Sequence, residues 1–353
     1  MSGSFTFGFH GDDIENSAEE SNESVAHHGG SHTAPASSSQ LPQAPAETLD
    51  LDEVLNSLPS KISYNTITIS SPRSNRTLEL PRRELFDIRM QLMAEDDNPS
   101  TASTNPTIAG LDSTTDIETN IYEGGFKTWE CSLDLATLLL DRGPRKDLDD
   151  LCRVDHVVEL GCGTALPTLI LFHHALQQSL PLYFTLADYN ASVLRLVTLP
   201  NILLIWAKAT SPSPISTPSG DLDLTPSLLT SFKTHLASQG IILTLISGAW
   251  SPSLVSRIPT SPSMSLLVLA SETIYSPDSL DAFTETLVQI LGKVKMGKAM
   301  LAAKRLYFGV GGSVDAFKSL AAEKGAVVGE VENHGVEGLD TGVGRWLGEV
   351  QMM

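Results

Sequence analysis

Cysteine is scarce in this chain of 353 residues, which contains only Cys131, Cys152 and Cys162. No two of them form a Cys-x-x-Cys pair, and none belongs to a Cys/His pattern typical of zinc sites. Such a set argues against a disulfide framework and against a structural zinc centre. We therefore expect a protein of a reducing compartment that holds no metal.

Long apolar runs are also missing, because charged residues interrupt the most apolar stretch at Asp188, Arg195 and Lys208. A membrane-spanning helix needs about 20 predominantly apolar residues, so the sequence predicts none. Residues 1–20 lack the basic start and the apolar core of a secretory leader. The chain is therefore expected to be soluble and intracellular.

Basic residues are few: 23 Lys and Arg stand against 42 Asp and Glu, which gives a formal net charge of −19. Residues 1–53 contain ten of the acidic residues and no Lys or Arg. This acidity disfavours binding to phosphate backbones and to anionic membranes, and it suits a basic protein partner. We expect no direct contact with nucleic acid or with a membrane.

Charged residues make up only 18% of the chain, against about 25% in ordinary globular domains. We assign residues 1–48 to a disordered acidic and polar tail with a short aromatic segment, FTFGF, because this composition offers little apolar area to bury. Residues 49–95 are a strand and helix extension, and 96–116 are a polar linker. Residues 117–353 are the main domain, in which the Ser/Pro/Thr-rich residues 207–226 are predicted to be a disordered insertion.

The extension shows three short patterns. Residues 49–59 are typical of an amphipathic turn, and residues 62–70 have the composition of a strand. Residues 81–95 are expected to form a helix with Pro81 near its start, a position that proline favours.

The main domain alternates apolar runs with helical segments. Strands are predicted at 154–163, 181–190, 241–250, 265–275, 298–308, 326–333 and 345–351. Helices are predicted at 164–178, 192–201, 278–292 and 312–325. This alternation predicts an α/β fold: a doubly wound, mostly parallel, seven-stranded sheet of the Rossmann-like type with helices on both faces.

Ligands of doubly wound sheets bind at the carboxyl ends of the strands, so the end of the first strand is informative. It runs into ELGCG, in which Gly161 and Gly163 permit a tight turn and a close approach of backbone to ligand. A dinucleotide fingerprint would place Gly or Ala at Leu166, which argues against NAD. Asp188 ends the second strand, where an acid meets ribose hydroxyls in nucleotide-binding sheets.

Five motifs in chain order carry a resemblance to a known family: YEGGFKTWECSLDLA, ELGCGTALP, ADYNASVLRLVTLPN, SGAW and SETIYSP. Together with FTFGFHGDDI and PRRELFDIRMQLMAE, they resemble the histidine protein methyltransferases that act on ribosomal large-subunit protein three. That family belongs to the seven-stranded class I methyltransferases. The resemblance implies S-adenosylmethionine as methyl donor and a basic ribosomal protein as substrate, and we expect a monomer in the cytoplasm and nucleus.

The resemblance also implies where the site residues lie. The methionine part of the cofactor is expected over the glycine loop, the ribose near Asp188 and the adenine near SGAW, with residues 128–132 closing over the methionine end. The implied cofactor-binding residues are Thr128, Trp129, Glu130, Cys131, Ser132, Glu159, Gly161, Gly163, Asp188, Tyr189, Gly248, Ala249, Trp250 and Ser271. The implied catalytic residues are Glu272, Tyr275 and Asn190.

Several of these residues also fit a purely structural role. Trp129 and Trp250 suit an ordinary aromatic core, and Tyr275 suits lid packing as well as substrate contact. Glu272 could cap the helix that follows it. A carboxylate at a strand end beside a cationic sulfonium nevertheless favours a functional role for Glu272.

Other positions bear on function less directly. His156, His173 and His174 are expected to be packed or surface residues. Ala249 stands where the family often has an acid, so a polar contact beside the adenine is expected to be missing, although backbone amides could still serve.

Three functions are consistent with the sequence. The first is methylation of a ribosomal-protein histidine, whose neutral imidazole offers a lone pair at physiological pH, whereas a lysine must first lose a proton. The second is lysine methylation on the same scaffold. The third is a cofactor-binding ribosome-assembly factor with little turnover, which Ala249 and the acidic tail suggest.

Overall fold

The structure, a computed structural model, describes residues 44–73, 75–95, 125–142, 154–210, 212–307, 311–331 and 344–353. All of them belong to one unit, Leu41–Met353. The polar linker 96–116, Cys152 and the tail before Ala44 lie outside the described residues.

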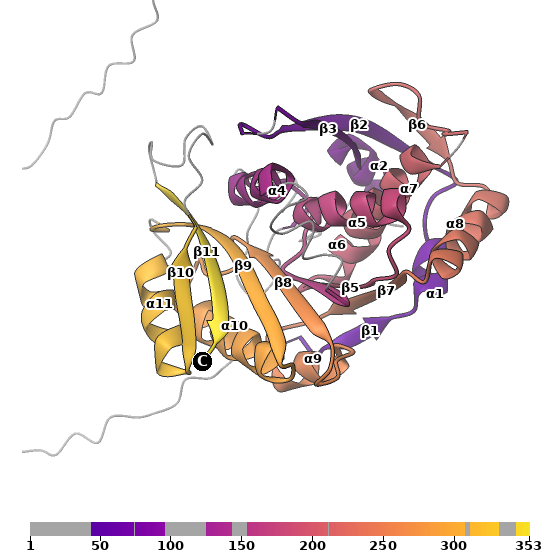
Figure 1. Ribbon diagram of the computed structural model, residues 1–353. Helices are drawn as coiled ribbons and strands as arrows, with labels where there is room; N and C mark the ends of the chain where they lie inside the picture. The colour runs from indigo at the N-terminus through magenta and orange to yellow at the C-terminus, as the bar shows by residue number, and fades with distance from the viewer. Residues whose placement is uncertain are drawn as a thin grey trace, which may run out of the picture. The chain divides into compact units, whose positions relative to one another are not determined.

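A large sheet forms the centre of the described chain. Its strands are β1 (Glu47–Leu49), β4 (His156–Leu160), β5 (Tyr183–Asp188), β7 (Ile242–Ser247), β8 (Ser265–Ser271), β9 (Met296–Lys304), β10 (Ala326–Glu330) and β11 (Arg345–Met352). They lie in the order β1-β7-β5-β4-β8-β9-β11-β10 (Figure 1). The five strands from β7 to β9 are parallel, and β1, β11 and β10 pair antiparallel. The predicted α/β fold with a mostly parallel sheet is confirmed.

Helices cover both faces of this sheet (Figure 1). One face carries α4 (Glu130–Arg142), α5 (Leu166–Gln178) and α7 (Leu199–Ala209); the other carries α9 (Pro252–Arg257), α10 (Pro277–Gly292) and α11 (Val314–Glu323). Along β8, Leu267 and Leu269 join the first core, whereas Leu266, Val268 and Ala270 join the second. This alternation explains the continuous apolar run of a strand buried on both faces.

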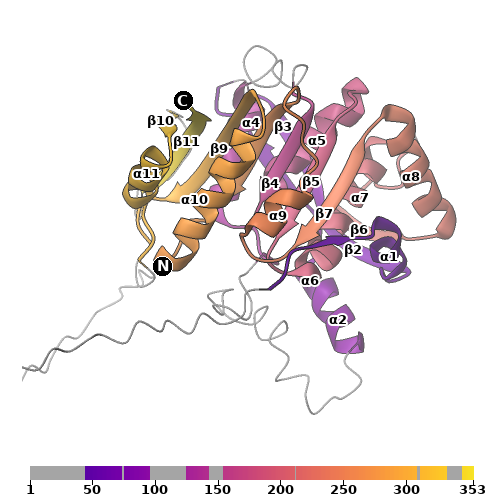
Figure 2. The same ribbon diagram turned by 90° about the horizontal axis from the view of Figure 1, so that it is seen from below.

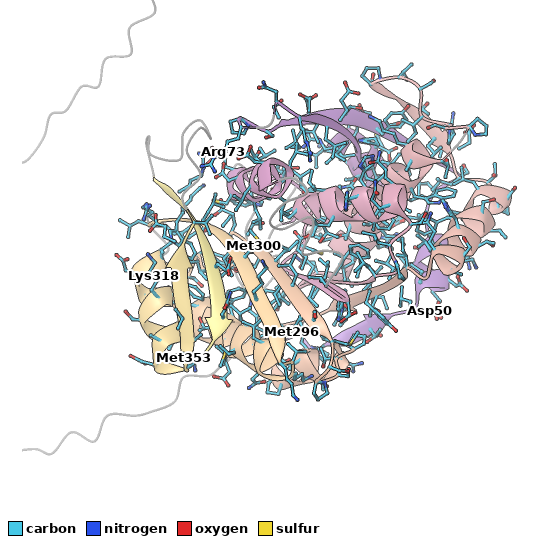
Figure 3. The ribbon with its side chains drawn as sticks, viewed as in Figure 1. Asp50, Arg73, Met296, Met300, Lys318 and Met353 are labelled. Atoms are coloured by element: carbon cyan, nitrogen blue, oxygen red, sulfur yellow. The ribbon has the colours of Figure 1, made fainter. Side chains whose placement is uncertain are left out.

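The strand β9 shows how the sheet is placed in the fold. Met300 at its centre is fully buried, while Met296 at its start is 61% exposed (Figure 3). β9 runs parallel to β8, and β8 runs parallel to β4, so the carboxyl ends of all three strands lie on the same side of the sheet. The parallel strands therefore end along one edge of the sheet.

A second, smaller sheet has the order β3-β2-β6. Its strands are β2 (Lys61–Ser70), β3 (Thr77–Arg83) and β6 (Ser219–Asp223). It lies on the outer side of α4, α5 and α7 (Figures 1 and 2), where Ile62, Tyr64 and Leu80 enter the same core as those helices. The remaining elements are α1 (Leu51–Asn56), α2 (Leu85–Glu95), α6 (Ala191–Val193), the π-helical turn η4 (Leu194–Thr198) and α8 (Pro226–Gln239).

Two segments expected to be disordered are strands. Glu47–Leu49, which begins inside the predicted tail 1–48 and ends at the first residue of the extension, adds an eighth strand to the predicted seven by pairing with β7. Ser219–Asp223, inside the predicted insertion 207–226, pairs with β2, with Lys61 opposite Asp223. Both strands are short and carry mostly exposed side chains, so backbone hydrogen bonds hold them and composition does not reveal them.

Two helix boundaries also differ from the prediction. Pro81 lies in β3 opposite Thr66 rather than at a helix start, and α2 begins at Leu85. Because β3 is an edge strand, it tolerates a residue without an N–H group. The helix predicted at 192–201 continues to Ala209 through η4 and α7.

That long helical stretch, Ala191–Ala209, is the one described segment that is long and apolar enough to cross a membrane by length and composition alone. In its most apolar window, 78% is buried inside the fold. Its apolar surface is therefore used in packing against the rest of the domain, as in a core helix.

Candidate functional site

The glycine loop stands where the strand order reverses. It follows β4, with β5 on one side of that strand and β8 on the other, which is the topological switch point where such sheets bind ligands. Gly161 and Gly163 have φ values of 65° and 49°, a region that favours glycine. A Cβ on Gly161 would lie 2.8 Å from Thr273 Cγ2, so the loop also touches the segment that follows β8.

The chain before α4 crosses over this loop. A Cβ on Gly163 would lie 3.2 Å from the carbonyl oxygen of Gly125, which itself has a φ of 112°. Thr128, a little further along, accepts a hydrogen bond from Arg82 Nη1 at 2.9 Å, and its hydroxyl lies 3.4 Å from that of Thr164. Residues 125–128 are thereby held between the extension and the glycine loop.

The other implied residues of this segment have divided roles. Lys304 Nζ lies 5.6 Å from the centre of the Trp129 ring and 3.7 Å from Glu130 Oε2, and Glu130 is exposed. Ser132 Oγ donates to the Trp129 carbonyl at 2.8 Å, so it stabilises the first turn of α4. Cys131 is fully buried and points toward the carboxyl group that follows β8.

Asp188 ties the end of β5 to the glycine loop. Its Oδ2 accepts from the Gly163 N–H at 2.9 Å and its Oδ1 from the Asn190 N–H at 3.1 Å. Both carboxylate oxygens thus accept backbone N–H groups, which fixes the Asp188 side chain at the carboxyl end of β5. Tyr189 and Asn190 follow, both half-buried, on the β5 side of the loop.

Glu159 lies inside the sheet rather than in an open site. It is fully buried, and its Oε2 accepts from the Thr168 N–H at 3.1 Å in the first turn of α5. Burial raises its pKa to about 8, and the nearby Asp188 carboxylate adds to the rise. At neutral pH the Glu159 carboxyl is therefore mostly protonated and joins β4 to α5.

The SGAW segment meets the beginning of the described chain. A Cβ on Gly248 would lie 2.6 Å from Ala46 Cα, and the Ala249 N–H donates to the Ala44 carbonyl at 3.0 Å. The Ala249 amide, one of the backbone amides that could serve beside an adenine, is thus already bonded within the protein. Trp250 remains the group of this segment that faces the loop, 3.8 Å from a Cβ placed on Gly161.

Glu272 is the carboxylate at the end of β8. It has a φ of 57°, a left-handed conformation rare outside glycine, and its N–H donates to the Ala302 carbonyl at 2.9 Å. Tyr307 donates its hydroxyl to Glu272 Oε2 at 2.6 Å. Oε1 is screened from solvent, and no described residue donates an N–H or O–H to it.

The Cys131 thiol lies beside this carboxyl group, and burial followed by the Glu272 charge raises the thiol pKa above its usual range. A thiol is a weak donor, so Glu272 Oε1 keeps acceptor capacity. Ser271 and Tyr275 flank Glu272 and are half-buried. Asn190 follows β5, which places it on the other side of the glycine loop from Glu272.

Two polar residues of the apolar run LVTLPNILLIW were missed by the sequence analysis. Thr198 Oγ1 donates to the Gly163 carbonyl at 2.7 Å, and Asn201 Nδ2 donates to the Thr164 carbonyl at 3.0 Å. Both are fully buried and bond to the glycine loop from one side. A polar residue inside such a run was the available signal, because buried polar groups require partners.

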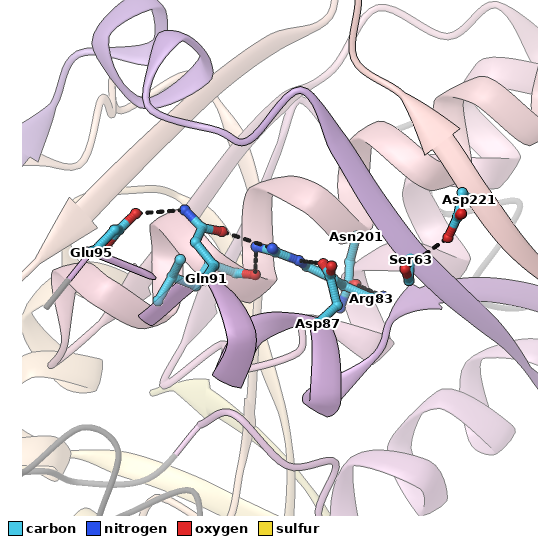
Figure 4. A network of polar contacts seen from close by, with 8 residues as sticks. Ser63, Arg83, Asp87, Gln91, Glu95, Asn201 and Asp221 are labelled. Carbon is cyan, nitrogen blue, oxygen red and sulfur yellow. Dashed lines mark hydrogen bonds and ion pairs between the residues drawn. The ribbon is translucent and has the colours of Figure 1, made fainter. Parts of the chain in front are cut away.

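Arg83 connects the extension to Asn201, which bonds to the same loop. Figure 4 shows Arg83 with Asn201, Asp87 and Gln91. Its N–H donates to Asn201 Oδ1 at 2.8 Å, and its guanidinium donates to Asp87 at 2.6 Å and to Gln91 at 2.7 Å. It also donates to the Leu196 carbonyl at 3.0 Å. The extension is therefore part of the site's support, a role that its sequence did not reveal.

The sequence also predicts packed or surface histidines and no metal site. His156 is fully buried at the start of β4, away from the loop, with Nε2 2.8 Å from Thr185 Oγ1, and burial lowers its pKa to about 4. It is a packed histidine, as expected. In the described part of the chain, no group of three or more His, Cys, Asp or Glu side chains is placed to hold a metal.

The chain is similar in sequence to known protein methyltransferases. No family model matches the chain. Histidine protein methyltransferase 1 of Saccharomyces cerevisiae is 43% identical over 266 residues, covering 69% of each chain. Histidine protein methyltransferase 1 of Schizosaccharomyces pombe is 39% identical over 283 residues, covering 79% of this chain and 78% of that one.

Solved structures are much more distant. A CurJ carbon methyltransferase is 11% identical with a TM-score of 0.37, covering 74% of this chain and 62% of that one. The DhpI–SAH complex is 12% identical with a TM-score of 0.32, covering 76% and 94%.

A doubly wound, mostly parallel sheet with a glycine loop at its switch point, and with carboxylates after the strands on both sides, is a ligand-binding α/β fold that agrees with a class I methyltransferase. The chain belongs to the histidine protein methyltransferase 1 family. It is therefore a protein methyltransferase, and its relatives support histidine as the residue that it modifies.

Proposed function

We propose that this protein transfers the methyl group of S-adenosylmethionine to an imidazole nitrogen of a histidine in a ribosomal large-subunit protein. The observation that carries the proposal is Glu272, a carboxylate at the end of β8 whose Oε2 is held by Tyr307 and whose buried Oε1 accepts no N–H or O–H from the described residues. The family name supports histidine as the target. The five motifs quoted above support a ribosomal substrate.

The described residues fit S-adenosylmethionine. Gly125 and Gly163 bring two stretches of backbone together where side chains would collide, Asp188 places a carboxylate at the end of β5 where ribose hydroxyls are expected, and Trp250 offers an aromatic ring beside the loop. When bound, S-adenosylmethionine supplies a methyl carbon activated by its sulfonium and leaves as the neutral thioether. The protein's own contribution is to bind, to align and to exclude water.

The residues around Glu272 are sufficient for a histidine of the substrate to accept the methyl group. An imidazole with a pKa near 6.5 is mostly neutral at physiological pH, so one nitrogen offers a lone pair and the other carries a proton. Glu272 Oε1 accepts that N–H and turns the opposite nitrogen toward the methyl group. After transfer the ring is a methylimidazolium, and Glu272 holds its remaining proton until water removes it.

The substrate and setting are parts of the same proposal. The net charge of −19 suits a Lys/Arg-rich ribosomal protein and disfavours direct contact with nucleic acid or a membrane. The acidic N-terminal residues would increase the rate of encounter with such a partner at low salt. We propose that the enzyme works as a monomer in the cytoplasm and nucleus.

The test combines recombinant enzyme, labelled S-adenosylmethionine and the ribosomal protein, with its candidate histidine either intact or replaced by Ala. We expect label only on the intact protein, and we expect Glu272→Ala to lower kcat much more than cofactor affinity. The variant Glu53→Ala, which changes an exposed acid in α1, is the control. Label that persists without the histidine, or that lies on lysine, would contradict the proposal; no transfer in a single-turnover assay would favour an assembly factor.

A further inference from the structure

Tyr307 contacts the Glu272 carboxylate although no motif of the sequence pointed to it. It follows β9, and its hydroxyl donates to Glu272 Oε2 at 2.6 Å while accepting from the Lys304 N–H at 3.2 Å. Burial, together with the Glu272 charge, raises the pKa of the Tyr307 hydroxyl above its usual range. The phenol therefore stays protonated at physiological pH and acts as a donor.

The described part of the chain between β9 and α11 also docks onto the segment after β8. The Tyr307 N–H donates to the Gly312 carbonyl at 2.9 Å, and the Gly312 N–H donates to the Tyr275 carbonyl at 3.0 Å. A Cβ on Gly312 would lie 2.1 Å from the Ile274 carbonyl oxygen, so only glycine allows this approach. One connection thus holds both ends of the Glu272-to-Tyr275 motif, by a side chain at one end and by backbone at the other.

The residues around Glu272 hold its backbone and its carboxylate in one conformation. A non-glycine residue in the left-handed region is strained and persists only where other contacts fix it. The Glu272 N–H bond to Ala302 fixes the backbone, and the Tyr307 hydroxyl fixes one carboxylate oxygen. Strain of this kind gathers at functional sites, where it sets the direction of a group.

We propose that Tyr307 is a positioning residue which, acting through Glu272, selects the imidazole nitrogen that receives the methyl group. The inference rests on the proposed function. By bonding to Oε2, Tyr307 stops rotation of the carboxylate and leaves Oε1, which is buried beside the Cys131 thiol and has no N–H or O–H donor among the described residues, as the oxygen for the target N–H. One ring nitrogen is then aligned for transfer and the other is not, because alignment within a fraction of an ångström governs such rates.

The variant Tyr307→Phe removes only the hydroxyl. A hydrogen bond to a charged group is lost, so we expect kcat to fall by about tenfold to a hundredfold. Cofactor affinity, measured by calorimetry without substrate, should stay within about twofold of wild type, since Tyr307 lies at the substrate end. We also expect the product, after hydrolysis and chromatography, to change from one methylhistidine isomer to a mixture of the two.

The control is Tyr183→Phe, which removes a hydroxyl at the start of β5, at the opposite edge of the sheet; it should match wild type in rate and isomer. In a Glu272→Gln background, Tyr307→Phe should add little, because the two residues act as one unit. Wild-type rate with a single isomer in Tyr307→Phe would overturn the inference. A lower rate with an unchanged single isomer and a lower Tm would also overturn it, as a purely structural effect. If the wild-type enzyme places the label on lysine, both the proposed function and this inference are overturned.

Discussion

The variant Glu159→Gln should make the cofactor-free protein more stable at neutral pH. Glu159 is fully buried between β4 and α5, and its pKa is about 8 instead of its ordinary 4.5. The folded protein therefore keeps the carboxyl proton up to about pH 8, whereas the unfolded chain releases it near pH 4.5. A glutamine has nearly the same shape, and its carbonyl can still accept from the Thr168 N–H.

The magnitude follows from the interval between these two pKa values. Because the folded state binds the extra proton, the contribution of Glu159 to stability is fully present below pH 4.5 and is lost as pH rises to 8. At about 1.36 kcal/mol for each pH unit, the loss is about 3 kcal/mol at pH 7 and about 4 kcal/mol at pH 8. Glutamine does not titrate, so the variant escapes this loss.

Urea denaturation of wild type and variant, followed by circular dichroism at pH 5, 6, 7 and 7.5, measures the difference. The gain in free energy of unfolding should be small at pH 5 and about 3 kcal/mol larger at pH 7.5. The matched control is Glu53→Gln, an exposed acid of α1, which should keep the wild-type pH profile. A gain that is the same at every pH, or that shrinks as pH rises, would refute the reasoning about burial.

Three further predictions concern the loop, the packed histidine and the tail. Gly163→Val should weaken S-adenosylmethionine binding at least tenfold in calorimetry with the fold retained by circular dichroism, because its Cβ would press on Gly125 O at 3.2 Å; unchanged affinity would place the cofactor elsewhere. His156, whose pKa is about 4 against 6.5 when unfolded, should reduce stability by about 3 kcal/mol as pH falls from 6.5 to 4, and His156→Gln should remove that slope in urea titrations, whereas a retained slope would assign it to other groups. Removal of residues 1–43 should leave the thermal transition in place, since the β1 pairing and the Ala44 contact remain; a lost transition would show that these residues are structural.

Much of the fold was predictable because burial leaves a pattern. The strands β4, β5, β7 and β8 are apolar runs buried on both faces, and the glycine loop and Asp188 follow from where two of them end. β1 and β6 were not predictable, since backbone pairing holds them and their side chains are mostly exposed. The sequence predicts a helix start at Pro81. A proline is tolerated in β3 because β3 is an edge strand, and no local pattern reveals that edge position.

The glycine loop of the site was predictable from the sequence. The residues that hold the site in place from other parts of the chain were less so. Motifs located Gly161, Gly163 and Glu272, whose chemistry depends on their own residue type. Tyr307 and Arg83 act through partners that are distant in sequence, at 2.6 Å from Glu272 and 2.8 Å from Asn201, and no local pattern encodes such a meeting. The same holds for the Ala249 amide, whose partner Ala44 lies more than two hundred residues away.

The short strand β1 also bears on how the protein avoids self-association. It covers Leu245 to Ser247 at the end of β7, which would otherwise present unpaired N–H and carbonyl groups at one border of the large sheet. An uncovered border of that kind is a template for pairing with another chain, and β7 is apolar. Loss of Ala44 to Leu49 should therefore reveal itself first as a concentration-dependent tendency to aggregate, before any change in the chemistry at the other strand ends.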